Sequence, residues 1–256
     1  MITIKTKEDI EILREGGRHL ASIFEALAKE VRPGTSTKEI DKMAFDLIKK
    51  AGGKPAFLNY KPEGVARPYP ASVCTSIDDE VVHGIPSEKR ILKEGEILSL
   101  DIGLLYKGLF TDMAVTVPVG EIDSTASRLL RVTERALMMG TSEARPGHTV
   151  GDIGAAIENY VKREKFTLNK VLAGHGVGYA LHEDPYIPNF GKRGEGVVLK
   201  PGMVIALEPM VNEGEAEVYL ADDGYTFLTK DGKRSAHFEH TVFVTEKEPE
   251  ILTSAI

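Results

Sequence analysis

Near the start of the chain, apolar positions recur with the period of amphipathic helices. Thr6 and Asp9 form a capping box ahead of apolar residues spaced three or four apart, so a helix is expected to begin there and to end before Pro33. A second box, with Glu39 as its acidic member, opens a helix over Ser36–Ala51 that a glycine pair stops. The chain therefore begins with two successive helices.

Between and after the helices, apolar runs rich in β-branched residues predict strands, with antiparallel hairpins expected. These runs cover Ala71–Ile77, Ile97–Val117, Met203–Val211 and Phe238–Val244. The chain therefore combines helices with antiparallel strands.

The Ile97–Val117 run contains its own turn signal, and two registers remain open. A turn at Tyr106-Lys107 sets Asp101 opposite Asp112, roughly 5 Å apart. A turn at Lys107-Gly108 sets Asp112 opposite Gly103 instead, still on the face of Asp101, whereas a three-residue loop would split the faces unless a bulge restored them. Two anions this close need a counter-charge. The alternative, a pair of solvated hairpin acids, is disfavoured by the apolar flanks.

Two related stretches each end on a carboxylate. Leu92-Lys-Glu-Gly leads to Asp101, and Leu199-Lys-Pro-Gly leads to Glu208, each nine positions after the leucine and at the close of an apolar run. A carboxylate in such a place is costly unless it is paired or binds a cation. The recurrence suggests one site built from two halves of the chain.

Further similarities between the two halves of the sequence extend the repeat. The stretch Arg145–Ile153 resembles Arg32–Ile40 at an offset of 113 residues, and both lead into helices. A third match, between the strands that follow Phe110 and Phe238, aligns Asp112 with Glu239 within a shift of one residue. A helix pair followed by strands therefore occurs twice, in halves of roughly 1–122 and 123–256 that form one domain over 1–256.

Composition limits the class of protein. The 256 residues are 42% hydrophobic and 28% charged, enough for a full core. The net charge of −7, with lysines and arginines scattered among acids, argues against a nucleic-acid partner. The start lacks the apolar core of a signal peptide, and no stretch approaches the roughly 20 apolar residues that span a bilayer. The single cysteine, Cys74, cannot form an internal disulfide. Together these features favour a cytoplasmic protein without membrane contact. A monomer is the default expectation for a single compact domain.

Histidines add to the candidate site. Four carboxylates suit oxygen-preferring to borderline cations, and one or two imidazoles would shift the preference towards Mn, Fe, Co or Zn. His175 lies between glycines, which allow close approach of its backbone. His83 and His182 each follow apolar residues and precede a turn, so either is a pocket acid–base group or a simple turn residue. His237 and His240 flank Glu239, where supporting or structural roles are expected.

Other catalytic templates fail. The chain has no His-Glu-x-x-His, no phosphate-binding Gly-x-x-x-x-Gly-Lys, no Cys-x-x-Cys and no Gly-x-Ser-x-Gly. Cys74 lies in an apolar strand without a nearby sequence partner, which favours a buried thiol over a nucleophile.

Short segments that occur in a fixed order along the chain are Ser72–Pro86, Leu100–Gly103, Thr111-Asp112, Gly174–Gly178, His182–Pro185, Leu207–Met210 and Phe238–Thr241. This ordered set resembles a known family, the type I methionine aminopeptidases, and the match runs from the first helix to Ile251.

The resemblance implies the pita-bread fold, a pseudo-twofold α/β domain with a curved antiparallel sheet and outer helices, which agrees with the internal repeat. It also implies two divalent metal ions, Co, Mn, Fe or Zn, that activate a shared water and polarise the scissile carbonyl. The implied ligands are Asp101, Asp112, His175, Glu208 and Glu239, with Asp112 and Glu239 bridging.

By the same resemblance, His182 would contact the carbonyl oxygen, His83 the substrate near the scissile nitrogen, and Glu208 would be the candidate proton shuttle. The implied reaction removes methionine from the N-termini of nascent polypeptides whose second residue is small, with transient ribosome contact.

Matching positions also suggest an apolar methionine pocket of Tyr60, Tyr69, Cys74, Leu181 and Tyr225. The sequence departs from the family pattern there. Leu181 stands where an aromatic residue is usual, Tyr225 stands where Trp is frequent, and Lys61–Arg67 looks like a small insertion.

Two competing hypotheses remain. A proline-directed aminopeptidase or dipeptidase shares the fold and ligands but typically carries an extra amino-terminal domain. A pita-bread binding protein without catalysis generally loses ligands, whereas all five ligand positions and both pocket histidines, His83 and His182, are filled here.

Overall fold

The computed structural model describes residues 2–62 and 64–254. Glu63, in the segment that looks like an insertion, lies outside these ranges. The helices are α1 (Lys7–Ala28), α2 (Thr37–Lys50), α3 (Ser124–Ser142) and α4 (Val150–Arg163). No helix within the described ranges combines the length and apolarity needed to cross a membrane.

Side-chain caps start the first two helices where the sequence predicts them. The Thr6 hydroxyl accepts the Asp9 N–H at 3.1 Å, and the Asp9 carboxylate accepts the Thr6 N–H at 2.9 Å. Ser36 and Glu39 form the same reciprocal pair ahead of α2. Gly52, just past the end of α2, has φ +78°, the left-handed backbone that glycine adopts without cost. Both predicted helices are confirmed.

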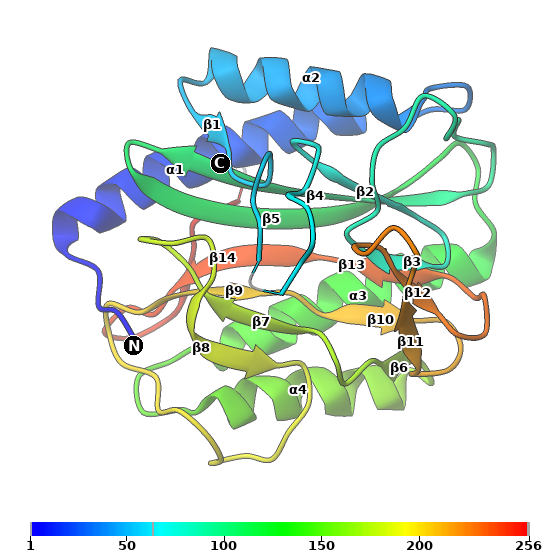
Figure 1. Cartoon of the computed structure of the whole chain (residues 1–256). Helices are drawn as coiled ribbons and strands as arrows, with labels where there is room; N and C mark the ends of the chain where they lie inside the picture. Colours follow the sequence, from blue (N-terminus) through cyan, green and yellow to red (C-terminus); the bar gives the residue numbers. More distant parts are fainter. Residues whose placement is uncertain (1, 63, 255–256) are drawn as a thin grey trace.

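The strands form one large antiparallel sheet and two small ones. The large sheet has the order β1-β4-β5-β14-β9-β7-β8, with β2 paired to β4 and β15 to β14; the small sheets are β13-β10-β6 and β11-β12-β3. In Figure 1, β5 and β14 lie side by side in the middle of the large sheet. The bounds are β1 (Lys54–Pro55), β2 (Cys74–Ile77), β3 (Glu80–Val82), β4 (Ile97–Tyr106), β5 (Leu109–Pro118), β6 (Thr167–Leu168), β7 (Ala173–Gly176), β8 (Glu183–Pro188), β9 (Val204–Leu207), β10 (Met210–Asn212), β11 (Val218–Leu220), β12 (Phe227–Thr229), β13 (Ser235–His237), β14 (Glu239–Phe243) and β15 (Glu250–Ile251).

The β4–β5 hairpin settles the open register. Gly103 pairs with Asp112, so the turn is Lys107-Gly108, and the register that set Asp101 opposite Asp112 is wrong. Lys107 has φ 48° and Gly108 has φ 90°, the two positive angles of a turn that matches the twist of the strands. Asp101 and Asp112 still share one face, because Asp101 lies two residues before Gly103.

The expected strand Met203–Val211 is two strands. β9 ends at Leu207 and β10 begins at Met210, and between them stands Pro209, which lacks the N–H that a sheet ladder needs. The break turns the chain from the large sheet into a small one immediately after Glu208.

The internal repeat is visible in the backbone pairing. Ser36 forms an isolated bridge with Ile91, and Thr149 forms one with Val198. Thr149 also opens α4 through a capping box with Asp152, as Ser36 does for α2. These pairs lie at the offsets that relate the sequence repeats, so the two halves share local structure as well as sequence.

The two faces of the large sheet differ in chemistry. On β4, the side chains of Leu98, Leu100, Ile102 and Leu104 pack in a core with α1 and α2. In the other half, strand residues including Ile205 and Val242 pack in a core with α3 and α4. The helices thus cover one face of the curved sheet (Figure 1), and the alternate positions of β4 point to the other.

Helix α1 also touches the C-terminal part of the chain very closely at Gly17. A Cβ added there would lie 2.1 Å from the carbonyl oxygen of Leu252, whereas one added at the preceding Gly16 would lie 3.5 Å from the nearest atom, in Tyr106. Only Gly17 is therefore required for backbone-to-backbone contact.

We expect Gly17→Ala to lower the free energy of unfolding by about 1–3 kcal/mol, because the backbone must move to admit the methyl group. Gly16→Ala is the matched control and should be neutral or stabilising by up to about 1 kcal/mol, since alanine favours helix. Urea denaturation of both variants measures the difference, and equal effects would contradict the close-contact explanation.

Candidate metal centre and adjoining pocket

Neighbouring strands of the large sheet present the candidate ligands on its open face. Residues paired directly across strands share a face, as do residues two apart along a strand. Asp101 on β4 and Glu239 on β14 both pair with Ala114 of β5, so these carboxylates share a face. His175 on β7 and Thr241 on β14 both pair with Ala206 of β9, so they share a face. Glu239 lies two residues before Thr241 and shares that face as well. The register alone therefore aligns β4, β14 and β7.

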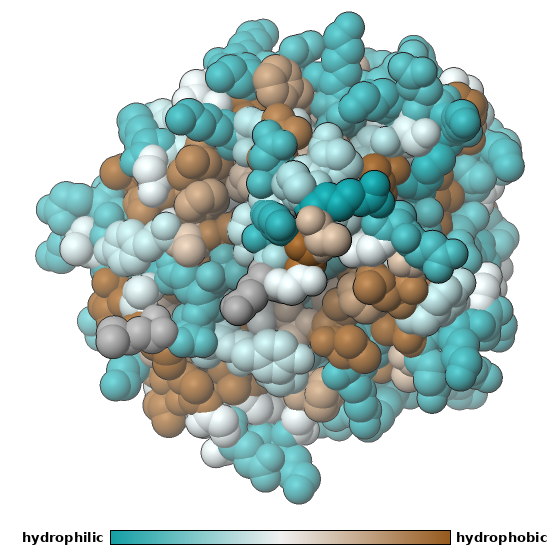
Figure 2. Space-filling view, in the orientation of Figure 1, coloured by the Kyte–Doolittle hydropathy of each residue, from teal (hydrophilic) through white to brown (hydrophobic). Residues whose placement is uncertain are grey.

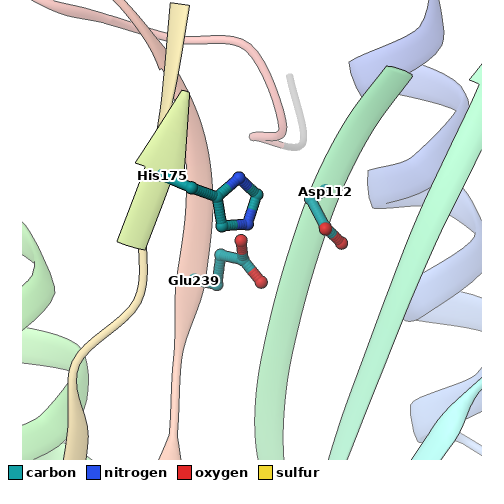
Figure 3. Close-up of side chains that lie close together, drawn as sticks. All are labelled: Asp112, His175 and Glu239. Atoms are coloured by element: carbon teal, nitrogen blue, oxygen red, sulfur yellow. The ribbon is translucent and has the colours of Figure 1, made fainter. Parts of the chain in front are cut away.

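The side chains converge in space. Ligand atoms of Asp112, His175 and Glu239 all lie within 4.8 Å of one another. Figure 3 shows the three side chains pointing toward one another from β5, β7 and β14. Glu208, directly after β9, places Oε1 at 3.5 Å from Nε2 of His175. All five residues expected to be ligands are thus brought together.

Asp101, Asp112 and Glu239 are buried and the side chain of Glu208 is 13% exposed, and no lysine or arginine among the described residues forms an ion pair with them. Oδ1 of Asp101 and Oε1 of Glu239 have no hydrogen-bond partner in the described part of the chain. Burial raises the pKa of Asp101 to about 7 and that of Glu208 to about 8. It also raises the pKa values of Asp112 and Glu239 well above their usual range, and neighbouring carboxylates add to the effect. A divalent cation fits this donor set, because it would hold the carboxylates ionised.

His175 is prepared to bind a metal through one nitrogen. Its Nδ1 lies 2.9 Å from the carbonyl oxygen of Gly176, a hydrogen bond that places the proton on Nδ1 and leaves the Nε2 lone pair facing Glu208. Burial lowers the pKa of His175 to about 3, so the ring is neutral at pH 7. A neutral imidazole with one free nitrogen is the form that ligates metals.

A cavity of about 470 Å³ extends outward from the ligands. Its mouth carries exposed apolar side chains, among them Tyr186 at 56% and Leu220 at 50% exposure. In Figure 2, hydrophobic side chains gather over the region occupied by β11 and β12 in Figure 1. The combination of buried polar groups and an apolar wall is typical of a ligand site.

The residues expected to form the methionine pocket lie together. Tyr69, Cys74, Leu181 and Tyr225 form one buried apolar cluster, against which Tyr60 packs. Tyr60, Tyr69, Cys74 and Tyr225 line the cavity, whereas Leu181 is not among its lining residues. Leu181 instead packs against Gly103 of β4, since a Cβ added at Gly103 would lie 3.0 Å from Cδ1 of Leu181.

Cys74 is a buried thiol, as the sequence indicates. It pairs with Asp101 across β2 and β4, so its side chain shares the open face of the sheet. Burial, followed by the charge of Asp101, raises the pKa of Cys74 well above its usual value. A thiol that stays protonated lines a pocket but is a poor nucleophile.

Both pocket histidines line the cavity. The ring of His182 meets that of His175 edge-on at 4.5 Å, and its Nδ1 lies 2.7 Å from the hydroxyl of Tyr60. His83 has φ 62°, an uncommon backbone conformation for a non-glycine residue. Burial, together with the nearby His237 and His182, lowers the pKa of His83 to about 4. Both rings face the cavity uncharged at pH 7.

His237 is closer to the centre than its sequence position indicated. It is fully buried, its Nε2 lies 3.6 Å from Oε2 of Glu208, and neither ring nitrogen has a hydrogen-bond partner among the described residues. The alternation along β13 and β14, with His237 two residues before Glu239, is the signal that could have placed it on the open face.

Other lining residues carry no such signal. Phe57, Val65, Leu172, Tyr186 and Leu220 come from separate loops and strands, so their convergence depends on tertiary structure.

The fold and the site together define a pita-bread metallopeptidase. The model of metallopeptidase family M24 matches residues 11–246, and the chain belongs to this family.

Named relatives agree. The chain is 46% identical over 253 residues to methionine aminopeptidase 1 of Bacillus subtilis, covering 99% of both chains. It superimposes on the crystal structure of a methionine aminopeptidase from Thermotoga maritima with a TM-score of 0.94 and 42% identity, covering 99% of this chain and 100% of that one. Prolidase from Pyrococcus furiosus is more distant, with a TM-score of 0.76 and 26% identity, covering 99% of this chain but 66% of the prolidase.

Replacing Asp112 with asparagine should separate folding from metal binding. In metal-free protein the variant should be more stable by about 1–2 kcal/mol, because a buried carboxylate among three others is removed. Mn²⁺ should then raise the melting temperature of the wild type but not of the variant.

Urea denaturation in the presence of a chelator and thermal melts with Mn²⁺ measure the two effects. Asp46→Asn, at an exposed position of α2, is the matched control and should change stability by less than about 0.5 kcal/mol. A variant of Asp112 that is destabilised without metal yet still stabilised by Mn²⁺ would rule out a central ligand role.

Proposed function

We propose that this protein is a methionine aminopeptidase that removes the initiator methionine from nascent chains whose second residue is small. The observation that carries the proposal is that five side chains able to ligate a metal line one cavity with the apolar residues Tyr60, Tyr69, Cys74 and Tyr225. Near-full-length relatives named methionine aminopeptidase support it. Because the substrate is a nascent chain, we expect the protein to act in the cytoplasm, with transient contact with the ribosome. We also expect it to be a monomer.

Two divalent cations, of Mn, Fe, Co or Zn, would be held by Asp101, Asp112, His175, Glu208 and Glu239. When bound, they would supply a hydroxide at neutral pH and polarise the scissile carbonyl. The protein contributes a rigid sheet that fixes the ligands and buried surroundings that strengthen their electrostatic effect.

His182 would stabilise the developing oxyanion. The Tyr60 hydroxyl lies 2.7 Å from Nδ1 of His182, and burial raises the pKa of Tyr60, which keeps that hydroxyl protonated as a donor. A bond from Tyr60 to Nδ1 leaves the proton of His182 on Nε2. Nε2–H can then donate to the carbonyl oxygen as negative charge develops.

His83 would bind the substrate near the scissile nitrogen, and Glu208 would carry a proton to the leaving amine. His83, neutral because of its low pKa, can hydrogen-bond the substrate near the scissile nitrogen without placing a second positive charge beside the metals. Glu208, with its carboxylate between His175 and His237, would take a proton and pass it to the leaving amine.

A peptide-cleavage assay tests the proposal. Protein freed of metal should cleave nothing, and adding Mn²⁺, Fe²⁺ or Co²⁺ should restore release of methionine from Met-Ala-Ser. Met-Leu-Ser, whose second residue is large, should be a poor substrate. Cleavage of Ala-Pro peptides with none of Met-Ala-Ser would transfer the assignment to the proline-directed relatives.

His182→Ala should lower kcat on Met-Ala-Ser by about a hundredfold or more while KM changes little, because its proposed hydrogen bond forms chiefly in the transition state. Bound metal, measured by elemental analysis, should stay at the wild-type level. His148→Ala, at a half-buried position outside the cavity lining, is the matched control. A fall in metal content that accounts for the lost activity would refute the oxyanion role.

A further inference from the structure

A buried ion pair ties the N-terminal segment to the loop that carries His182. Nζ of Lys5 lies 2.6 Å from Oε2 of Glu183, and the two side chains are only 1% and 7% exposed. The Thr3 hydroxyl donates to the same carboxylate oxygen. Two opposite charges removed from water in this way are held together strongly, since either alone would be an uncompensated buried ion.

Glu183 also shapes its own loop. Its second oxygen, Oε1, accepts the backbone N–H of Ala180 at 2.8 Å, which closes the connection between β7 and β8. His182 is the residue directly before Glu183, so the carboxylate that anchors the loop stands next to the imidazole.

The N-terminal segment fits the loop tightly. A Cβ added at Gly178 would lie 2.3 Å from Cε of Lys5, and Gly178 has φ +141°, a conformation that side chains rarely permit. The Lys5 ammonium also stands 4.9 Å from the ring centre of Tyr179, while the Lys5 backbone N–H donates to the Gly202 carbonyl at 2.8 Å. Lys5 is thus fixed on both its backbone and its side chain.

On the cavity side, the described contacts of His182 are few: it makes a hydrogen bond with Tyr60 and an edge-on ring contact with His175. His175 itself is held by β7, which pairs with β9 at His175 and Gly176 and with β8 at Gly176, opposite Glu183. These backbone pairs do not use the side chain of Lys5 or that of Glu183, so disturbing the ion pair should displace His182 while leaving the metal ligands in place.

We propose that Lys5 is a positioning residue of the catalytic site, which acts through Glu183 to hold His182 against the cavity. The proposal rests on the proposed function, in which His182 stabilises the oxyanion. A displacement of His182 by a fraction of an ångström would weaken its hydrogen bond in the transition state more than it would weaken substrate binding.

The test compares Lys5→Met with Lys7→Met, the same change at an exposed position at the start of α1. Lys5→Met should lower kcat on Met-Ala-Ser by about tenfold or more. KM and the affinity for Mn²⁺, measured by calorimetry, should stay within about twofold, and Lys7→Met should match the wild type. Wild-type activity on Met-Ala-Ser is measured first, so that failure of the proposed function is recognised separately.

Two further variants separate positioning from stability. In Lys5→Met/Glu183→Gln both charges are absent, so the melting temperature should recover while kcat stays low; recovery of kcat together with stability would overturn the proposal. In a His182→Ala background, Lys5→Met should have no further effect on kcat. A full additional loss there, an unchanged kcat in Lys5→Met alone, or a loss of Mn²⁺ affinity would each overturn it.

Discussion

A group of carboxylates that no lysine or arginine among the described residues neutralises is the constraint on which the structure depends. Asp101, Asp112 and Glu239 are buried, and the side chain of Glu208, 13% exposed, lies 3.5 Å from that of His175 and 3.6 Å from that of His237. Without a counter-ion such a group opposes folding, because burial raises each pKa and repulsion from neighbouring carboxylates adds to the rise for Asp101, Asp112 and Glu239. The stability of the remaining fold must offset that cost in the metal-free state.

A curved antiparallel sheet meets this constraint by separating its two faces. Leucines and isoleucines of β4 pack against α1 and α2, while the alternate positions hold Asp101 and Gly103 on the open face. Each candidate ligand comes from a different strand or strand end, so the backbone ladder sets the distances between them. The helices pack against the apolar side, and none of the described residues that line the cavity comes from a helix.

Much of this could be predicted from local sequence. The capping boxes at Thr6 and Ser36 are complete within four residues, and both helices begin where they indicate. The repeated Leu-Lys-x-Gly stretches matched Asp101 with Glu208, and both residues line the cavity. The shared face of Asp101 and Asp112 was also predictable, because both two-residue turns allow it.

What failed or stayed hidden depends on single backbone angles and distant contacts. The hairpin register depended on which two residues take the positive φ angles of the turn, and these are Lys107 and Gly108. Pro209 divided an apparently continuous strand. The ion pair of Lys5 with Glu183 joins residues 178 positions apart, and no periodicity in either segment indicates it. Likewise, alternation along the strands can place His237 on the open face, but its burial beside Glu208 depends on tertiary contacts.

The seam between β5 and β14 has a consequence for how the chain folds. Asp112 and Glu239 stand on opposite sides of that seam, and the paired residues there are Glu239 with Ala114 and His240 with Met113. A cation held by both carboxylates would act as a removable cross-link across more than a hundred residues of chain. Closing a loop of that length costs the unfolded chain on the order of 4–5 kcal/mol in the simplest polymer estimate. Metal supply would then govern how firmly the two halves of the molecule stay joined, as well as whether it can cut a peptide.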